Sequence, residues 1–421
     1  MSAAARIGRI GRALRHRNFR LYISGQLVSL VGTWLQVVAQ SWLVYRLTDS
    51  PLLLGVAGFV GQAPVFFLAP VGGAVADRVD KRRLLLATQS ASAVLAGVLG
   101  VLTLAGHVTI GHVLVVAGLL GAVNAMDMPT RQAFVVEMVG REDLANAIAL
   151  NSTAVNAARV LGPAVAGFVV AAVGEGWCFE LNAVSFLAVL IGLALIRTDR
   201  RPTLAVRRSA LTDVRDAWEF ITGHSAVAGI LVLLALVSVM GMPYAVLMPV
   251  FADRILGGGS RGLGILLGAT GIGALAAALV LAAREGSRGL GRWVAAAATG
   301  FGLSLVAFSA SRSFGLSVAA LLACGFFMMT HMAASNTLLQ VLTPDALRGR
   351  VMAAYSMAFM GMAPFGALGA GVAAARLGAP IAVAIGGVAV VAGGLYFALE
   401  LPRLRVSARA LLAARERPAG G

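Results

Sequence analysis

Twelve long apolar runs, joined by short polar connections, constrain this chain of 421 residues more than any other feature. A helix needs about 20 apolar residues to cross the hydrocarbon core of a bilayer. The chain is 59% hydrophobic and 12% charged, whereas soluble domains average about 45–50% and about 25%, so a soluble enzyme and a disordered chain are both disfavoured. The runs are continuous rather than alternating, which disfavours a β-barrel. We predict an all-α membrane protein of twelve transmembrane helices, at about residues 21–45, 52–76, 84–105, 111–128, 145–173, 177–196, 226–250, 262–283, 293–310, 316–340, 351–375 and 380–400.

The basic residues are distributed unevenly between the two sides of these spans. With the N-terminus in the cytoplasm, 28 of the 34 Lys and Arg residues fall in cytoplasmic segments, 5 fall on the opposite side, and Arg159 lies inside a span. This bias follows the positive-inside rule, so the net charge of +16 does not require a nucleic-acid partner. We predict a multi-pass protein of the inner (cytoplasmic) membrane with both termini cytoplasmic. A cleaved signal peptide is disfavoured, because the first run is too long and contains Gln26, Gln36 and Gln40.

The longest polar connection divides the spans into two groups of six. Within it, Leu211–Gly223 fits either an amphipathic helix on the membrane surface or a solvated linker. Weak similarity between the segments around Gly162-Pro163 and Ala363-Pro364 is typical of repeat-built transporters with a substrate site between the halves, but chance also explains it. We predict a basic N-terminus at 1–20, a six-helix bundle at 21–196, a linker at 197–224, a second six-helix bundle at 225–400 and a basic tail at 401–421.

A charged motif, Gly73-Ala-Val-Ala-Asp77-Arg78-Val-Asp80-Lys81-Arg82-Arg83, follows the second span. Asp77 lies at the C-terminal end of a helix, where the partial negative charge calls for a cationic partner. Arg348 and Arg350, at the start of the eleventh span, could provide it and so latch the halves together on the cytoplasmic side. By symmetry, Glu142 or Asp143 would meet Arg284 or Arg288. The alternative is ordinary basic flanking of a span. The predicted latch residues are Gly73, Asp77, Arg78, Lys81, Arg82, Arg348 and Arg350.

The pattern Gly73-x-x-x-Asp77-Arg78-x-x-Lys81-Arg82 resembles the signature between the second and third helices of the major facilitator superfamily, although Asp80 stands where that signature usually has Gly. Other segments resemble the branch that holds the enterobactin exporter and macrolide efflux proteins. They are Asn18-Phe19-Arg20-Leu21-Tyr22, Pro129-Thr130-Arg131-Gln132, Ala158-Arg159-Val160-Leu161-Gly162-Pro163 and Asn182-Ala183-Val184-Ser185-Phe186. The resemblance implies a twelve-helix, two-bundle carrier that works by alternating access, commonly in exchange for protons.

The fifth span carries an arginine in the middle of an apolar run. Ser152, Asn156, Arg159, Pro163 and Gly167 share one helix face at helical spacing. An arginine in a span costs at least about 2.5–3.5 kcal/mol on insertion scales, so Arg159 should face a cavity or an acid; alternatively, it extends toward the cytoplasm and pairs there. Arg159, Gly162, Pro163 and Gly167 resemble the antiporter motif of the superfamily, with Phe168 where a second glycine is usual.

Several polar side chains are candidates for a substrate cavity. Gln36 and Gln40 share a face of the first span and their amides need partners there, although small residues on the same face suit helix packing. His331 lies near Asn336 in the tenth span, and a lone histidine is more often a packing residue. The predicted cavity residues are Gln36, Gln40, Asn156, His331 and Asn336.

Proton coupling requires a group whose protonation responds to the alternation between wet and dry surroundings. Asp127 lies in the fourth span with Arg131 four residues later, which also fits a structural ion pair. Glu180 lies at the start of the sixth span and could likewise be structural. Both are proton-coupling candidates.

These features predict a secondary transporter that exports a small amphipathic molecule, such as a drug, a siderophore or another secondary metabolite, by proton antiport. The sequence contains no nucleotide-binding loop, nucleophile elbow or paired metal ligands, so we expect no enzyme activity, no metal and no cofactor. The expected partners are the substrate, protons and membrane lipids, with no nucleic acid and a monomeric chain. The alternatives are a lipid flippase or importer of the same fold and, from another class, a membrane scaffold or sensor without flux.

Overall fold

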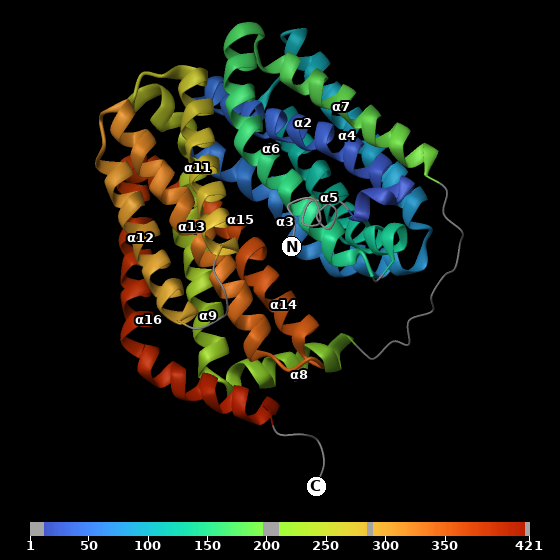
Figure 1. The fold of residues 1–421 in the computed structure, drawn as a ribbon. Helices are drawn as coiled ribbons and strands as arrows, with labels where there is room; N and C mark the ends of the chain where they lie inside the picture. The colour runs from blue at the N-terminus through green and yellow to red at the C-terminus, as the bar shows by residue number, and fades with distance from the viewer. Residues whose placement is uncertain (1–11, 141, 197–209, 284–288, 417–421) are drawn as a thin grey trace. The chain divides into compact units, whose positions relative to one another are not determined.

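The computed structural model describes residues 12–140, 142–196, 210–283 and 289–416, except for the side chains at 69, 70, 77, 210–214, 410 and 412–416. Within these ranges the chain forms helices joined by short connections and contains no strand (Figure 1). Twelve helical segments of the described chain are long and apolar enough to cross a membrane, which confirms the predicted spans and the all-α membrane fold. Contacts divide the chain into two compact units, which we call unit 1 (Met1–Thr203 and Ala252–Gly268) and unit 2 (Leu204–Phe251 and Ala269–Gly421).

Unit 1 contains the first six spans and is built from regular α-helices. Local capping explains where several of them start. Ser50 accepts the N–H of Leu53 at the start of α3, and Thr109 forms a capping box with His112 at the start of α5. Its helices are η1 (Arg12–Arg15), α2 (Arg17–Thr48), α3 (Pro51–Arg78), α4 (Lys81–Leu104), α5 (Ile110–Val139), α6 (Leu144–Val173) and α7 (Glu175–Leu195).

Asp80, which replaces the usual glycine of the superfamily signature, has a local role in unit 1. Its side chain accepts the N–H of Arg83 at 3.0 Å and caps the N-terminus of α4. A carboxylate at a helix N-terminus also offsets the positive end of the helix dipole. Asp80 therefore acts as the N-cap of α4, a role that does not require the backbone freedom of glycine.

Unit 2 contains the remaining spans, and two of them leave α-helical geometry. π-helical turns occupy η2 and η5, whereas a third π-helical turn, η4, lies almost wholly in the segment Ala252–Gly268 that groups with unit 1. Prolines 243, 249 and 364 lie in the segments that follow or adjoin these turns. The helices from α8 onward are α8 (Ala210–Gly223), α9 (Ser225–Leu236), η2 (Val237–Gly241), η3 (Met242–Ala245), α10 (Met248–Val250), η4 (Phe251–Ile255), α11 (Gly259–Ala282), α12 (Leu290–Ala310), α13 (Phe314–Leu342), α14 (Arg348–Ser356), η5 (Met357–Gly361), α15 (Ala363–Leu377) and α16 (Ala379–Glu416).

The unit boundaries differ from the predicted bundle boundaries in one segment. Ala252–Gly268, which the prediction places in the second bundle, groups with unit 1, so α11 begins in unit 1 and ends in unit 2. The predicted amphipathic segment at Leu211–Gly223 is helical and lies in α8, where Trp218 is 67% exposed. Its position at a membrane surface stays a prediction.

Close helix contacts in both units depend on glycine. A Cβ added at Gly72 of α3 would collide with the carbonyl oxygen of Ala125 of α5, and one at Gly325 of α13 would collide with that of Thr270 of α11. Small residues at such positions let two helix backbones approach directly. A Cβ at Gly73, by contrast, would meet no atom within 4 Å, so only the first glycine of this pair serves close packing.

Candidate functional site

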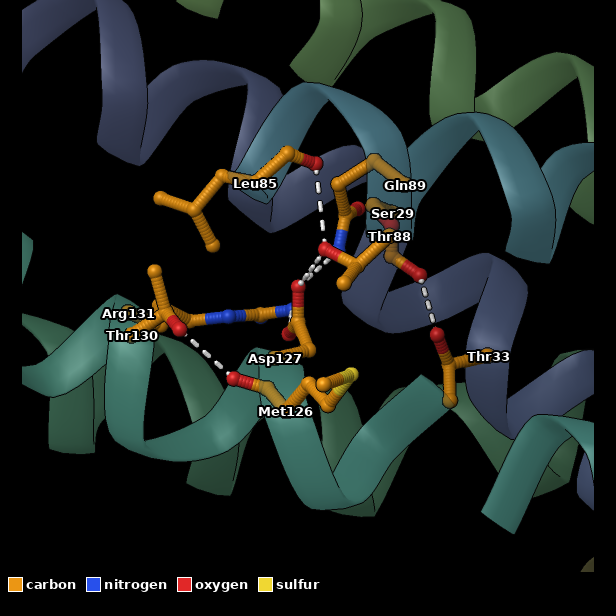
Figure 2. Close-up of polar contacts among 9 residues, drawn as sticks. All are labelled: Ser29, Thr33, Leu85, Thr88, Gln89, Met126, Asp127, Thr130 and Arg131. Atoms are coloured by element: carbon orange, nitrogen blue, oxygen red, sulfur yellow. Dashed lines mark hydrogen bonds and ion pairs between the residues drawn. The ribbon is translucent and has the colours of Figure 1, made fainter. Parts of the chain in front are cut away.

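A buried carboxylate lies between α4 and α5 of unit 1 (Figure 2). Asp127 of α5 is 2% exposed. Its Oδ1 accepts hydrogen bonds from Thr88 Oγ1 at 2.8 Å and from Gln89 Nε2 at 2.7 Å, both on α4. Its Oδ2 forms an ion pair with Arg131, one turn further along α5. The two oxygens of one membrane-embedded carboxylate thus have three donors, which together compensate the cost of burying its charge.

The backbone beside Asp127 is also unusual. Pro129 lies inside α5 and has no N–H, so the carbonyl of Ala125 lacks its helical hydrogen bond. Gly72 of α3 packs closely against this same carbonyl. The loosened turn of α5, the close glycine contact and the buried ion pair therefore occupy one short stretch, residues 125–131.

Further buried polar atoms without a protein partner lie on the helices around this cluster. Among the described residues, Tyr22 Oη, Gln26 Oε1 and Gln89 Oε1 have no hydrogen-bond partner. Ser29, one turn after Gln26 on α2, is also buried, and its carbonyl accepts the hydroxyl of Thr33 at 2.9 Å (Figure 2). Such atoms can form a hydrogen bond with a buried water, so the helices around Asp127 carry hydrogen-bonding groups that the described side chains leave unused.

Chemically, this cluster can respond to a proton. With Asp127 ionised, the Arg131 guanidinium and two neutral donors are satisfied. Protonation would remove the attraction to Arg131 and leave a buried cation without its counter-ion, which is costly in a low-dielectric interior. The arrangement therefore joins one ion pair on α5 to two hydrogen bonds from α4.

Sequence reasoning identified Asp127 and Arg131 but missed Thr88 and Gln89. The signal was present: Thr88, Gln89 and Ser92 form a polar stripe at helical spacing in the third span. All three are buried.

Glu180, the other proton-coupling candidate, has different surroundings. It lies on α7 and is half-buried, and a Cβ at Gly100 of α4 would collide with its carboxyl group. Its Oε1 has no partner in the described part of the chain.

The predicted cavity residues of the first half form contacts inside unit 1. Gln36 is 5% exposed and accepts a 2.5 Å hydrogen bond from Asn182 Nδ2 of α7, while its own Nε2 has no partner among the described side chains. Gln40 is half-buried on α2. Asn156 is half-buried on α6 and donates to the Ser152 carbonyl at 2.9 Å. Gln36 therefore connects two helices of one unit, a contact that spacing within one helix could not predict.

The antiporter-like motif lies on α6. Arg159 is half-buried, and Pro163 is buried inside the helix. Gly162 packs against the Trp34 side chain of α2, and Gly167 packs against the backbone at Gly264 of α11. Both glycines thus permit close packing, as their small size predicts.

The cavity candidates of the second half lie on α13. His331 is fully buried, and its Nδ1 donates to the Val294 carbonyl of α12 at 3.2 Å. Its Nε2 and the Ser335 hydroxyl have no partner within the described ranges. Asn336 is half-buried and accepts a 2.6 Å hydrogen bond from Gln340. His331 therefore contacts a neighbouring helix of its own unit.

Four of the predicted latch residues have partners within their own units. Lys81 pairs with Glu137 at 2.6 Å. Arg82 donates to the carbonyls of Leu193 and Ala194 at 2.6 and 2.7 Å, which satisfies the C-terminal end of α7. In unit 2, Arg348 pairs with Asp345, and Arg350 pairs with Asp216 of α8 at 2.7 Å. Arg78 is exposed, and the Asp77 side chain lies outside the described residues. The latch stays a prediction.

The symmetric acid of the proposed latch also has local partners. Asp143 lies 3.0 Å from Arg12 Nε and 2.9 Å from His16 Nε2. The hydrogen bond with His16 lowers the pKa of Asp143 below its usual value, and the charge of Arg12 adds to the effect. Arg284 and Arg288 lie outside the described residues, so the contact predicted for them stays untested.

The described residues contain no group of three His, Cys, Asp or Glu side chains arranged to hold a metal ion. The polar chemistry of the described chain is therefore that of ion pairs, amides and hydroxyl groups. One buried cluster of this kind is the one around Asp127.

Comparison with known proteins places the chain among transporters. The staphyloferrin A transporter of Staphylococcus aureus is 29% identical over 265 residues, which cover 62% of this chain and 66% of that protein. The multidrug efflux pump Tap of Mycolicibacterium fortuitum is 26% identical over 412 residues, which cover 94% and 96%. The enterobactin exporter EntS of Shigella boydii is 24% identical over 338 residues, which cover 80% of each. The chain thus spans slightly less than two thirds of the first of these relatives.

Solved structures share the fold at low sequence identity. A bacterial homolog of the human lysosomal transporter Spinster aligns with a TM-score of 0.68 at 14% identity, over 98% of this chain and 99% of that one. A peptide transporter POT aligns with a TM-score of 0.74 at 13% identity, over 92% and 94%. The profile of the transmembrane secretion effector family matches residues 12–417. The chain therefore belongs to the transmembrane secretion effector family and is a transporter of the major facilitator superfamily.

Proposed function

We propose that this transporter exports a small amphipathic molecule across the cytoplasmic membrane in exchange for protons, by alternating access. The observation that carries the coupling part of the proposal is the buried Asp127–Arg131 pair with its two donors on α4. Burying an ion pair inside a span costs free energy, so such pairs are rare and commonly have a structural or functional role. Proton exchange supplies such a role, because the same carboxylate can alternate between an ionised and a neutral form.

Asp127 supports this role better than Glu180. Protonation of Asp127 changes an ion pair on α5 and two hydrogen bonds to α4 at once. Glu180 has one carboxyl oxygen without a partner among the described side chains, so its protonation would rearrange fewer contacts. The loosened helical turn at Pro129 lies between Asp127 and Arg131, where a change in the pair can alter the helix.

The proposed substrate class rests on the relatives. A staphyloferrin A transporter, an enterobactin exporter and a multidrug efflux pump all match this chain at 24–29% identity. Siderophores and drugs of these kinds are small molecules, which fits the proposed export of a siderophore, a drug or another secondary metabolite. Arg159, half-buried on α6, is the proposed cationic contact for an anionic group on such a molecule.

The orientation proposed for the chain places both termini in the cytoplasm. It is supported by the 28 basic residues on one side of the spans against 5 on the other. In this orientation Asp77, Arg348 and Arg350 lie at the cytoplasmic ends of their spans, where the predicted latch would close. We expect the monomer to be the working form.

The experiment is a transport assay on the full chain in proteoliposomes with an imposed pH gradient. A panel of labelled siderophores and drugs identifies a substrate. The wild type should accumulate this substrate in proportion to the pH gradient, and Asp127→Asn should lose this dependence. Glu180→Gln should retain it. Glu219→Gln, which removes an exposed carboxylate of α8, is the matched control.

The outcomes separate the alternatives. Flux without any response to the pH gradient would point to a uniporter and overturn proton antiport. Movement of fluorescent lipid in place of the panel compounds would indicate a flippase. If no compound moves and Arg159→Ala leaves cellular activity unchanged, the scaffold or sensor alternative is favoured.

A further inference from the structure

An open groove of about 140 Å³ lies within unit 2, where four helices end or begin on one side of the membrane. It is formed by the starts of α9 and α12, the end of α13 and the distal part of α16. Alternating spans bring these helix ends to the same side, the side that also carries the C-terminus. In a bilayer, we expect helix ends of this kind to lie near the headgroups of one leaflet.

The floor of the groove is apolar. It is lined by six apolar side chains: Ile230, Leu290, Leu338, Leu342, Phe397 and Leu401. Leu342 is 4% exposed and Phe397 is 5% exposed, so the walls are held firmly in the bundle. A surface of this kind suits a hydrocarbon chain and does not suit a free inorganic anion.

Two arginines lie at the groove. Arg292, in the first turn of α12, is exposed, and Arg405 of α16 is half-buried. Neither has an ion-pair partner among the described residues. Nearby arginines of unit 2 do: Arg348 pairs with Asp345, and Arg403 pairs with Glu400. The groove therefore combines apolar walls with positive charge that the described protein residues do not neutralise.

The geometry of α16 places Arg405 at the groove. This helix has 38 residues and is about 57 Å long, compared with about 30 Å for the hydrocarbon core, so it continues beyond the membrane. Pro402 lies inside it, and the helix changes direction toward its C-terminal end (Figure 1). One face of α16 lines the groove. At helical spacing it presents three apolar side chains followed by one arginine: Phe397, Leu401, Leu404 and Arg405.

The start of α12 adds to this charge. Its N-cap residue, Gly289, provides no side-chain acceptor for the first N–H groups, so the N-cap itself leaves the positive end of the helix dipole uncompensated. This contribution is secondary to the two guanidinium groups. It acts in the same direction, toward an anion at the rim of the groove.

We propose that this groove binds an anionic phospholipid of the leaflet on the side of the termini, with its phosphate between Arg292 and Arg405 and part of an acyl chain on the apolar floor. Arginine suits phosphate because its planar guanidinium presents paired donors. Basic pockets between transmembrane helices at a leaflet surface are suited to anionic headgroups. The position, the charge and the apolar walls all fit this one occupant.

The test measures lipid binding to the purified full chain in detergent by native mass spectrometry. Phosphatidylglycerol is added to the wild type, to Arg292→Gln/Arg405→Gln and to Arg403→Gln. Each arginine near a lipid surface contributes about fivefold in affinity, so the double variant should bind about 30-fold more weakly. Arg403→Gln, which removes a cation of the same segment outside the groove, should bind like the wild type.

Two further probes identify the ligand. Phosphatidylcholine, with no net charge, should bind much more weakly than phosphatidylglycerol, and glycerol 3-phosphate, with no acyl chain, should not bind measurably. Equal binding of the two lipids would overturn the proposal. So would wild-type affinity in the double variant, or binding of glycerol 3-phosphate as tight as that of the lipid.

A second variant tests the proposal independently in case the double arginine variant does not fold. Ala408→Phe keeps both arginines and fills the groove with a side chain, so it should also weaken phosphatidylglycerol binding. Circular dichroism establishes which variants are folded. If only Ala408→Phe is folded, unchanged lipid binding by that variant overturns the proposal.

Discussion

Unit 1 and unit 2 bury different chemistry. Within the described residues, the buried carboxylates are Asp127 and Glu175, both in unit 1, where Arg131 and Arg46 neutralise them. The buried polar side chains of unit 2 are hydroxyl groups and the imidazole of His331. Among the described residues, the buried carboxylates are therefore concentrated in one unit.

The backbone shows the opposite distribution. Pro129 and Pro163 of unit 1 lie inside helices that remain α-helical throughout. In unit 2, π-helical turns interrupt two spans, at Val237–Gly241 and Met357–Gly361, and the turn at Phe251–Ile255 lies almost wholly in the later segment that groups with unit 1. π-Bulges weaken the regular hydrogen-bond ladder and are frequent at functional sites. The comparison therefore sets the buried ion pairs of unit 1 against the two π-interrupted spans of unit 2.

The largest expected effect on stability comes from breaking the buried pair of unit 1. Asp127→Ala leaves Arg131 without its counter-ion and should lower the free energy of unfolding in detergent by about 3–5 kcal/mol. Asp127→Ala/Arg131→Met should lower it less than the single variant, because no unpaired charge remains. Unfolding is followed by circular dichroism in increasing denaturant.

His331→Leu provides the comparison in unit 2. It removes one 3.2 Å hydrogen bond and an unpartnered nitrogen, and should change stability by only about 1 kcal/mol. If His331→Leu lowers the free energy of unfolding as much as Asp127→Ala does, the contrast between the interiors of the two units is wrong.

A smaller effect tests whether the two units are packed alike. Gly72→Ala and Gly325→Ala each place a methyl group against a backbone carbonyl of the neighbouring helix, and each should cost about 1–3 kcal/mol. Gly73→Ala and Gly369→Ala are the matched controls, because a Cβ meets no atom within 4 Å at either position. In the two controls the free energy of unfolding should rise by up to about 1 kcal/mol, because alanine has a higher helix propensity than glycine. A loss in either control would show that packing does not explain the difference.

The smallest effect concerns pH. The pKa of Asp143 is lowered in the folded state, so its ion pairs stabilise the fold fully above the ordinary value of about 3.9. This stabilisation is lost as the pH falls below that value and through the folded pKa. Asp143→Asn should therefore flatten the acid limb of a stability profile measured between pH 7 and pH 3. The comparison site in unit 2 is Arg215, whose pKa is raised by Glu219. Both side chains of this pair are largely exposed, so the pair contributes little to stability, and Arg215→Gln should leave the shape of the profile nearly unchanged.

The fold could be predicted well because it depends on hydrophobicity over long windows. Twelve apolar runs predict twelve helices in the described chain whatever their side-chain contacts. The π-helical turns could not be predicted in the same way, because Met357–Gly361 is as apolar and helix-favouring as its neighbours. Pro364, visible in the sequence, marks only the end of that irregular segment.

The site was harder to predict because its contacts join different helices. The i to i+4 spacing predicts the Asp127–Arg131 pair, and the structure confirms it. The donors Thr88 and Gln89 are some 40 residues away in sequence, and only the packing of α4 against α5 brings them to Asp127. The same limit applies to Gln36, whose partner Asn182 lies on α7. Periodicity identifies a polar face but not the helix that it contacts.

The central claim is tested most directly by proton movement that depends on substrate. Proteoliposomes that contain the full chain and a trapped pH-sensitive dye receive the substrate found in the panel, with the membrane potential clamped. The wild type should move protons against the direction of substrate movement, and Asp127→Asn should move substrate without protons while Glu219→Gln behaves like the wild type. Proton movement by Asp127→Asn equal to that of the wild type would contradict the account.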